Sequence, residues 1–570
     1  MLLNALIDLY NKLKEKGEVD IEWNPSGKVH YGIDINDNGT IFQIIPMIDG
    51  KKPALLKVPI SIEKETGSAD YEKYICGSGR YFLGYDFKND VVKESSSKVT
   101  ADYHRKLFKD RKSHVLDAVT AFFDRYSSNL ETLHQDTDLA KNKDKYKAAT
   151  FILCYQGKPL TEYREVCEIW ENEFNSRINK DKDFSARSLI SGRQDIIAKT
   201  HPGVSVPGGT NPSLISFNAD SFESYGFEQS YNARIGKLEA IKYSSAINYM
   251  LSKNNYHNSL NGMTLLMWSD TAEPEYSCFE RDILLGMFNK KEDNKTILQS
   301  DLKAIADKIA HGEKAEYDNA EIDPDTKFYI CGLRANGGRV QIMFFAENRF
   351  GNFVQNINKH YDRMSLNNEF AKHLTPFFVL KETVRDTDSI NKNISSSLIK
   401  SILSDTRYPD ELFYGVIDRI KKECGKVNVA KVQIIKMYLS KNCPNIGKEV
   451  LDMDLNKKTH ETSYLLGRLF AILEKIQKDT GVENLASKNF NGAMSQPSRT
   501  FPSLFRKSQY YLKKLSDVSK VYYDRLIQDI MENINSFPEH LSLIEQGEFV
   551  LGYYHQKENL YTKKEAKQED

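Results

Sequence analysis

The residues best suited to chemistry with a polyanion lie between positions 499 and 525. This segment carries seven basic side chains against two acids, Asp517 and Asp524. Four basic residues recur every seven positions and two more repeat the step one position later: Arg499, Arg506, Lys513 and Lys520, then Lys507 and Lys514. Because a helix rises about 1.5 Å per residue, this spacing predicts cations about 10 Å apart along one helix face. We expect Pro502 in the first turn, with Arg499 just outside the helix.

Such a row of cations suits a phosphate backbone, where sequence-independent contacts dominate affinity. The alternative explanation is a solvated outer helix face. A shorter basic cluster between residues 104 and 114 has the same two explanations.

A second candidate site is the loop from Cys76 to Tyr81. Its glycines let the backbone approach a ligand closely, and Arg80 offers a bidentate donor. Ser78, Gly79 and Arg80 are therefore candidate ligand contacts. The alternative is an ordinary tight turn that precedes a strand at residues 81–85.

Motifs typical of enzymes are missing from the sequence. It contains no GxxxxGK[ST] phosphate loop, no HExxH and no His-Asp pair of a metal-dependent nuclease. The seven cysteines include no CxxC pair, so we predict neither a zinc ribbon nor a disulfide framework, and a reducing cytoplasm fits. Pro409-Asp410 begins a nuclease-type pattern, but a helix is predicted to follow it. We expect a protein that is not an enzyme, with no catalytic residue, metal or cofactor; a stand-alone nuclease is an alternative.

Length and composition indicate a large globular protein. The 570 residues allow about three or four domains. The 79 basic and 79 acidic residues cancel, so any nucleic-acid site must arise from local segregation of charge. No run of 18 apolar residues and no signal-peptide pattern occur, which favours a cytoplasmic location.

Hydrophobic periodicity predicts an α+β protein: an N-terminal mixed α/β body with antiparallel hairpins, followed by an all-helical C-terminal bundle. Leucines at helical spacing predict an opening helix that ends near Gly17. Alternation predicts a hairpin at residues 29–45 with its turn at 37–39, and another from strands 327–333 and 339–345 with its turn at 335–338. Val340, Ile342 and Phe344 should share one face of the second hairpin, with Arg339 on the other.

Further along, residues 202–212 are interpreted as a loop and residues 381–397 as a connection between helical parts. Four regions are predicted: 1–205, an N-terminal α+β region; 206–355, a central α+β region; 356–452, a helical connecting region; and 453–570, a C-terminal helical bundle.

Several sequence blocks resemble one known family. They are residues 214–219 (LISFNA), 222–226 (FESYG) with 228–229 (EQ), 328–333 (FYICGL), 464–470 (YLLGRLF) and 551–556 (LGYYHQ). In this order, over nearly the whole chain, they resemble the Csd-one family, the large subunit of the type I-C CRISPR Cascade, also called Cas-eight-c. Among these residues, Phe217, Phe222, Tyr225, Leu466 and Phe470 are assigned to packing.

The resemblance implies a DNA-binding subunit without catalysis of its own. The chain would join a CRISPR RNA complex with a Csd-two backbone and a Cas-five subunit. Its N-terminal region would read the protospacer-adjacent motif in double-stranded target DNA, and guide pairing would read the sequence. Its C-terminal region would support the displaced strand, and the complex would recruit the Cas-three helicase-nuclease. A scaffold that touches no DNA is an alternative.

In this context six cations become predicted contacts to the DNA backbone: Arg506, Lys507, Lys513, Lys514, Lys520 and Arg339. One departure concerns the loop. Where relatives often carry Asp-Asn after the cysteine, this chain has Gly77-Ser78, so Ser78 or Arg80 must substitute, or a different motif is read.

In this family an internal start can yield a separate small subunit. Met453 is well placed for one and would give a product of 118 residues, counted from Met453 to Asp570. The preceding Lys448-Glu449-Val450 can be encoded as a purine-rich ribosome-binding sequence. Met437 is the alternative start, but it is predicted to lie within a helix.

Overall fold

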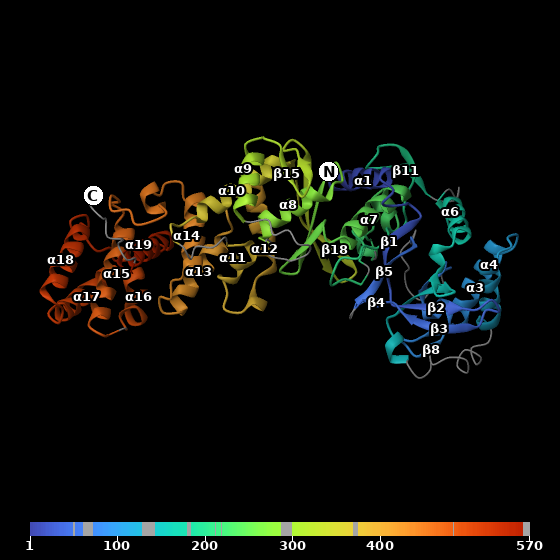
Figure 1. Cartoon of the computed structure of the whole chain (residues 1–570), viewed down its shortest axis with the longest axis horizontal. Helices are drawn as coiled ribbons and strands as arrows, with labels where there is room; N and C mark the ends of the chain where they lie inside the picture. Colours follow the sequence, from blue (N-terminus) through green and yellow to red (C-terminus); the bar gives the residue numbers. More distant parts are fainter. Residues whose placement is uncertain are drawn as a thin grey trace. The chain divides into compact units, whose positions relative to one another are not determined.

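The computed structural model describes residues 1–49, 52–60, 72–127, 143–178, 184–210, 212–217, 219–286, 299–368, 374–482 and 484–561. The chain divides into two compact units. The first comprises Met1–His257, Asp270–Glu273 and Leu333–Ile342, and the second comprises Asn258–Ser269, Pro274–Gly332 and Met343–Asp570. The finer division into four regions stays a prediction. Figure 1 labels the elements in chain order.

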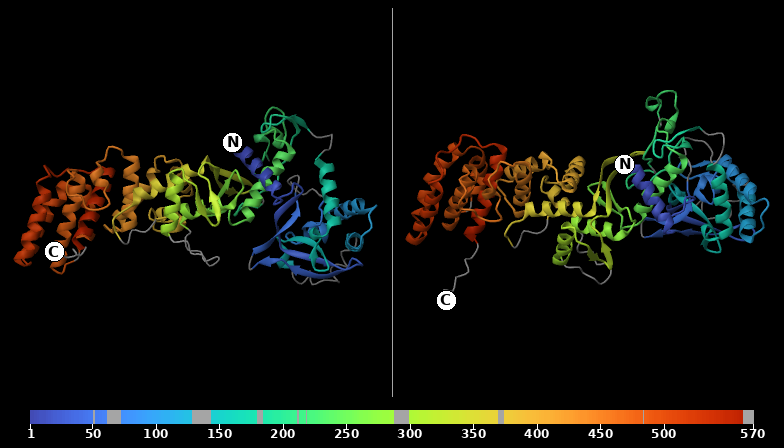
Figure 2. Two further views of the ribbon diagram at one scale, coloured as in Figure 1. Left: turned by 45° about the horizontal axis from the view of Figure 1, so that its top comes forward. Right: turned by 90° about the horizontal axis from the view of Figure 1, so that it is seen from above.

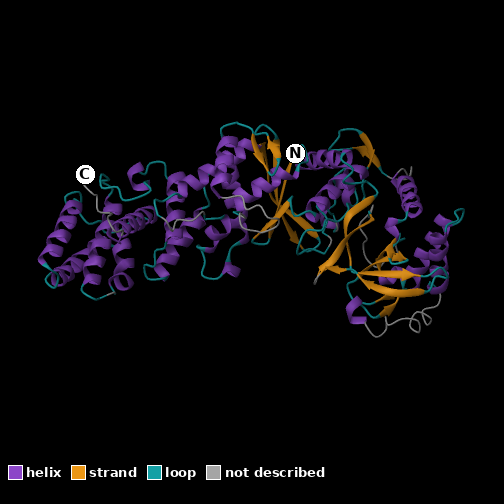
Figure 3. Ribbon diagram, viewed as in Figure 1, coloured by secondary structure: helices purple, strands orange, loops and turns teal. Residues whose placement is uncertain are grey.

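Strands are confined to the N-terminal part of the chain (Figure 3). From residue 350 onward, every regular element in the described residues is a helix. The α+β class predicted from periodicity is therefore confirmed.

The first unit opens with the predicted helix α1 (Leu2–Glu15), in which Leu6, Leu9 and Leu13 are buried and Leu2 is half-buried. Gly17 follows with φ of +72°, as expected just beyond a helix end. The other helices of this unit are α2 (Gly79–Phe82), α3 (Glu94–Phe108), α4 (His114–Tyr126), α6 (Arg164–Ile178) and α7 (Lys237–Ser252).

This unit contains a five-stranded mixed sheet. Its order is β10 (Lys158–Pro159), β9 (Thr150–Tyr155), β2 (Tyr31–Ile35), β3 (Ile41–Pro46), and β6 (Cys76–Ser78) also pairs with β9. The β2–β3 pair is the predicted first hairpin, whereas β2 and β9 run parallel. Apolar residues of β2, β9 and α4 share one core, including Ile33, Phe151 and Phe122.

Val29 belongs to a different strand from the hairpin. It ends β1 (Trp23–Val29), which pairs with β5 (Lys52–Pro59), and β5 pairs with β4 (Ile48–Asp49). Three strand pairs complete the smaller sheets: β7 (Tyr85–Asp86) with β8 (Val91–Val92), β11 (Ser185–Arg187) with β12 (Gln194–Ile196), and β15 (Ala315–Tyr317) with β16 (Ala320–Ile322).

The second predicted hairpin belongs to a four-stranded sheet. The order is β13 (His257–Leu260), β14 (Met263–Ser269), β17 (Lys327–Asn336), β18 (Arg339–Arg349). β17 and β18 are adjacent, which confirms the hairpin, and its turn is shorter than predicted because β17 continues to Asn336. Val340 and Phe344 are buried as expected, but Ile342 is exposed.

Besides the β15–β16 pair, the regular elements in the rest of the second unit are helices. They are α8 (Pro274–Leu285), α9 (Gln299–Ala310), α10 (Phe350–Met364), α11 (Pro376–Lys381), α12 (Lys392–Ser404), α13 (Asp410–Lys422), α14 (Val429–Asn442), α15 (Thr462–Asp479), α16 (Leu485–Ser495), α17 (Pro497–Leu512), α18 (Asp517–Met531) and α19 (Leu543–Tyr561).

The last five helices form the predicted C-terminal bundle, seen side by side in both views of Figure 2. α15 and α19 cross in backbone contact, because a Cβ on Gly467 would lie 2.0 Å from the Phe549 carbonyl oxygen, and one on Gly552 would lie 2.1 Å from that of Tyr464. Glycine is therefore required at this crossing.

One predicted connection is wrong. Residues 392–397, including Ser395 and Ser396, belong to α12, whose first turn is capped by the Asn391 side chain. Both serines are buried and only Ser397 of the triplet is exposed, so the segment that resembled a linker is a helix packed on its neighbours. Residues 202–212 form a loop as predicted, apart from Asn211, which lies outside the described residues, as does Asn218 of the family block.

Candidate nucleic-acid interface

The predicted row of cations lies on two helices rather than one. α17 begins at Pro497 and ends at Leu512, with Lys513 as its C-cap. Ser516 then caps α18, its hydroxyl accepting a hydrogen bond from the Ser519 amide. The prediction of a single helix face is therefore wrong: the backbone turns between Lys513 and Ser516.

The placement of Arg499 and Pro502 also differs from the prediction. Arg499 lies inside α17, and Pro502 lies beyond its first turn. Pro497 instead occupies the first helical position, where the missing amide hydrogen costs nothing.

The cations of α17 and α18 nevertheless form one set of solvent-exposed charges. The exposed side chains are Arg499, Arg506, Lys507, Lys513, Lys514, Lys520 and Arg525. We call Arg506, Lys507, Lys513, Lys514 and Lys520 the α17–α18 cations. Within the described residues none of them forms an ion pair; Lys514 lies over the ring of Tyr510, 4.3 Å from its centroid.

The apolar faces of the two helices explain this exposure. Phe501, Leu504 and Leu512 of α17 are buried, as are Tyr523 and Ile530 of α18. Both helices pack on α15, and the Tyr523 hydroxyl donates a hydrogen bond to Asp479 there. The opposite faces therefore carry cations without carboxylate partners, an arrangement that can bind phosphates.

The loop at residues 76–81 is built differently from the prediction. Cys76–Ser78 is strand β6, and Gly79–Phe82 is one turn of helix, so the predicted strand at residues 81–85 is wrong. A Cβ on Gly79 would lie 2.5 Å from Cε2 of Phe87, which shows that this buried glycine permits close packing. Ser78 and Arg80 are half-buried, with the Arg80 guanidinium 4.8 Å from the Tyr81 ring centroid. Their contact to DNA stays a prediction.

Arg339 begins β18 and is half-buried. Its guanidinium stacks on the ring of Phe222, 4.4 Å from the centroid. It belongs to the first unit and the α17–α18 cations belong to the second, so the two are separate candidate contacts.

The short basic cluster at residues 104–114 is only partly a solvated face. His104 is fully buried, and burial lowers its pKa to about 4. Arg105 forms ion pairs with Asp102 and Asp124. These two residues therefore serve the fold of α3 and α4.

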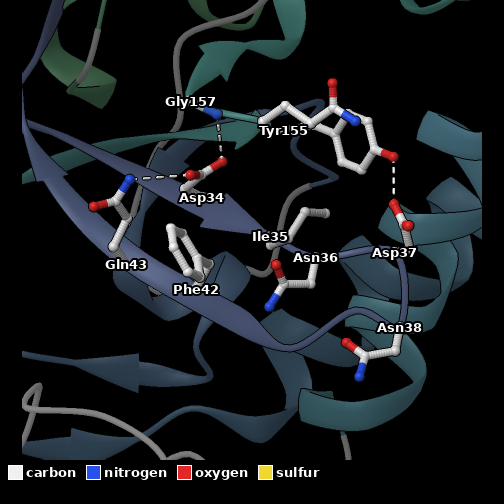
Figure 4. A pocket seen from close by; sticks show the side chains of 10 residues that line it. Asp34, Ile35, Asn36, Asp37, Asn38, Phe42, Gln43, Tyr155 and Gly157 are labelled. Atoms are coloured by element: carbon white, nitrogen blue, oxygen red, sulfur yellow. Dashed lines mark hydrogen bonds between the residues drawn. The ribbon is translucent and has the colours of Figure 1, made fainter.

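Sequence reasoning missed a cleft of about 670 Å³ beside the first hairpin (Figure 4). Buried Asp34 accepts hydrogen bonds there from Gln43 Nε2 at 3.2 Å and from the Gly157 amide at 2.9 Å. The Tyr155 hydroxyl donates to Asp37. The described residues that line the cleft include two carboxylates and no Lys or Arg, so they are unsuited to binding phosphate. Residues 34 and 157 come together only through the β2–β9 pairing, so no local sequence pattern predicts this cleft.

The predicted internal start lies in an irregular stretch between α14 and α15. Met453 is 56% exposed, and its carbonyl accepts a hydrogen bond from the Asn367 amide at 2.9 Å. Met437 is buried inside α14, which confirms its predicted helical position.

Other groups give no sign of a metal or membrane site. Asp410 opens α13, as predicted, and accepts a hydrogen bond from the Tyr438 hydroxyl at 2.6 Å. Over the described ranges, no group of three His, Cys, Asp or Glu side chains is arranged to hold a metal ion. No helix in the same ranges has the length and apolarity needed to cross a bilayer.

Comparison with known proteins gives one clear match. A search of curated proteins found none similar to this chain. The model of the family described as CRISPR-associated protein (Cas_Csd1) matches residues 6–561, nearly the whole length. This extent agrees with the family blocks distributed from residue 214 to residue 556. The chain therefore belongs to the Cas_Csd1 family of CRISPR-associated proteins.

Proposed function

We propose that this chain is the non-enzymatic large subunit of a type I-C CRISPR surveillance complex, and that it captures double-stranded DNA for guide-RNA pairing. The observation that carries the proposal is the set of α17–α18 cations, exposed and without ion-pair partners in the described residues. The clustering of these cations does not stabilise the fold of a chain with zero net charge, but it favours the binding of phosphates.

The proposed assembly contains the Csd-two backbone, a Cas-five subunit and the CRISPR RNA. The N-terminal segment with Ser78 and Arg80 reads the adjacent motif, and the Cas-three helicase-nuclease recruited by the complex cuts the DNA. Membership of the CRISPR-associated family supports this arrangement. The chemistry of Arg80 also supports it, since a guanidinium pairs well with the guanine edge.

A separate small subunit from Met453 is part of the proposal. The product would contain α15 to α19 complete, because Met453 precedes Thr462, the first residue of α15. Reading the codons before Met453 tests it: a sequence that cannot form a purine-rich site would exclude this start.

The main experiment is electrophoretic binding of motif-bearing duplex DNA by the reconstituted complex. Omission of this chain should abolish binding. Changing Arg506, Lys513 and Lys520 to Glu should weaken binding whatever the DNA sequence. A matched control changes three exposed lysines elsewhere, Lys12, Lys158 and Lys327, to Glu, with the same change in net charge.

Three outcomes would contradict parts of the proposal. Unchanged binding without this chain would show that it does not capture the target. Equal loss in the two triple variants would show that net charge, rather than the α17–α18 cations, governs affinity. Metal-dependent cleavage by the purified chain would show that it is an enzyme.

A further inference from the structure

A tight turn in the first unit holds a tyrosine in a strained conformation. The Phe227 amide donates to the Ser224 carbonyl at 3.1 Å, and the two residues between them, Tyr225 and Gly226, have φ of +55° and +73°. Two successive positive φ angles are typical of turns in which Asn-Gly is preferred. A bulky side chain is costly there, and Tyr225 is 95% exposed, so packing on this chain cannot repay the cost.

The prediction that Tyr225 serves packing is therefore wrong, and the same prediction for Phe222 holds only in part. Phe222 is 44% exposed and carries Arg339 on its ring, whereas Leu466 and Phe470 are fully buried as expected. Backbone strain that packing within the chain does not offset indicates a function for the strained residue.

The turn is braced so that it presents Tyr225 rigidly. Asn232 Oδ1 accepts hydrogen bonds from the amide of Ser224 at 3.0 Å and from its hydroxyl at 3.2 Å. Asn232 Nδ2 donates to the carbonyls of Phe227 at 2.6 Å and Gln229 at 2.8 Å. A preorganised aromatic side chain loses little conformational entropy on binding, which is typical of the anchor of a protein interface.

The charges around the turn decide between a protein and a nucleic acid. Between residues 219 and 233 the charged residues are Asp220, Glu223 and Glu228, with no Lys or Arg. Of the described cations nearby, Lys199 pairs with Glu228 at 3.4 Å, and the guanidinium groups of Arg234 and Arg339 lie over the rings of Phe227 and Phe222, 4.8 and 4.4 Å from their centroids. Asp220 and Glu223 form no ion pair within the described residues. The phosphates that flank a stacked base would face carboxylates, so a protein surface with an apolar socket and a basic rim is the better partner.

We propose that Tyr225, with Phe222 beside it, anchors this chain in an apolar socket, rimmed by lysine or arginine, on a protein subunit of the RNA-guided assembly. This inference rests on the proposed function, because RNA-binding subunits present the basic surface that the acidic turn requires.

The experiment compares full-length variants in two assays. The first is thermal unfolding of each purified chain, and the second is its affinity for the assembly of CRISPR RNA, backbone and Cas-five subunits prepared without it. Tyr225→Asn removes the ring and places a residue that tolerates positive φ in the turn. We expect its unfolding temperature to stay the same or rise by about 2 °C. Its affinity for the assembly should fall at least about tenfold.

Two further variants complete the design. Tyr225→Phe keeps the ring and should retain binding. Leu189→Ala truncates another apolar side chain of the same unit, 66% exposed, and should alter neither assay.

The outcomes separate the inference from the proposed function. A wild-type chain that does not join the assembly overturns both. A wild-type chain that joins, together with a Tyr225→Asn chain that joins equally well, overturns the inference alone. A marked drop in unfolding temperature would assign Tyr225 a structural role and overturn it too. Normal assembly with loss of oligonucleotide binding would make a nucleobase the occupant.

Discussion

The salt dependence of DNA binding should report directly on the α17–α18 cations. Each phosphate neutralised contributes about −0.9 to the slope of log affinity against log salt. Five exposed cations, each on one phosphate, would contribute a slope of about −4.5. Changing Arg506, Lys513 and Lys520 to Gln leaves two, with a contribution of about −1.8. Between about 50 and 200 mM salt the five-cation contribution lowers affinity by roughly 500-fold, and the two-cation contribution lowers it by roughly 12-fold.

The assay is fluorescence anisotropy of a labelled duplex, titrated with the reconstituted complex at several salt concentrations. Other subunits and the guide RNA add their own slopes, so the informative quantity is the difference of about 2.7 between wild type and variant. The variant in which Lys12, Lys158 and Lys327 become Gln should keep the wild-type slope. A difference below about 1 would mean that fewer than two of the three cations contact phosphate, and the reasoning from exposure would fail.

Three further predictions concern stability and motif reading. Glu280 is fully buried, neither carboxylate oxygen has a hydrogen-bond partner in the described residues, and burial raises its pKa from 4.5 to about 8. The folded state therefore binds the proton more tightly than the unfolded state. As pH rises from about 4.5 to about 8, the wild-type chain should lose up to about 5 kcal/mol of unfolding free energy relative to Glu280→Gln, measured by denaturant unfolding. A difference in unfolding free energy that does not change with pH would contradict this prediction. Gly552→Ala should destabilise the chain by about 1–3 kcal/mol in the same assay, because the added Cβ would lie 2.1 Å from the Tyr464 carbonyl oxygen. An unhindered Gly→Ala change in a helix would instead stabilise the chain by about 1 kcal/mol. Arg80→Gln should lower the preference for motif-bearing over scrambled duplex by roughly tenfold or more, measured by competition binding with the complex. The same preference in the variant as in the wild type would show that Arg80 does not read the motif.

The parts of the fold that were predicted correctly depend on local patterns. The opening helix and the first hairpin follow from residues a few positions apart, so periodicity and a turn sequence were enough. The error at α12 had the opposite origin. Three serines resembled a linker, yet Asn391 before them was an available capping signal, and Leu398, Ile399 and Ile402 keep helical spacing.

The candidate interface was predicted in composition but not in shape. Spacing placed Arg506, Lys513 and Lys520 together, and the structure leaves all three exposed. The break between α17 and α18 depends on Ser516, which caps α18 and so begins a new helix within residues 499–525, despite the regular spacing of the cations. The cleft at Asp34 has no local sequence signal, since it depends on contacts between distant segments. The turn at Tyr225 is built locally by residues 224–232, but its central Tyr-Gly pair is not the Asn-Gly pair that is typical of such turns.

A net charge of zero is compatible with the proposed binding to DNA because electrostatic screening makes the interaction local. At physiological ionic strength the Debye length is about 8 Å, so a phosphate senses the charges of one or two helical turns rather than those of the whole chain. Residues 499–525 carry an excess of five positive charges, and the rest of the chain therefore carries an equal negative excess. This distribution does more than permit binding. Because the remaining surface repels DNA on average, the proposed sequence-independent contacts would concentrate on the α17–α18 cations, whereas a uniformly basic subunit of the same affinity would bind DNA in many orientations.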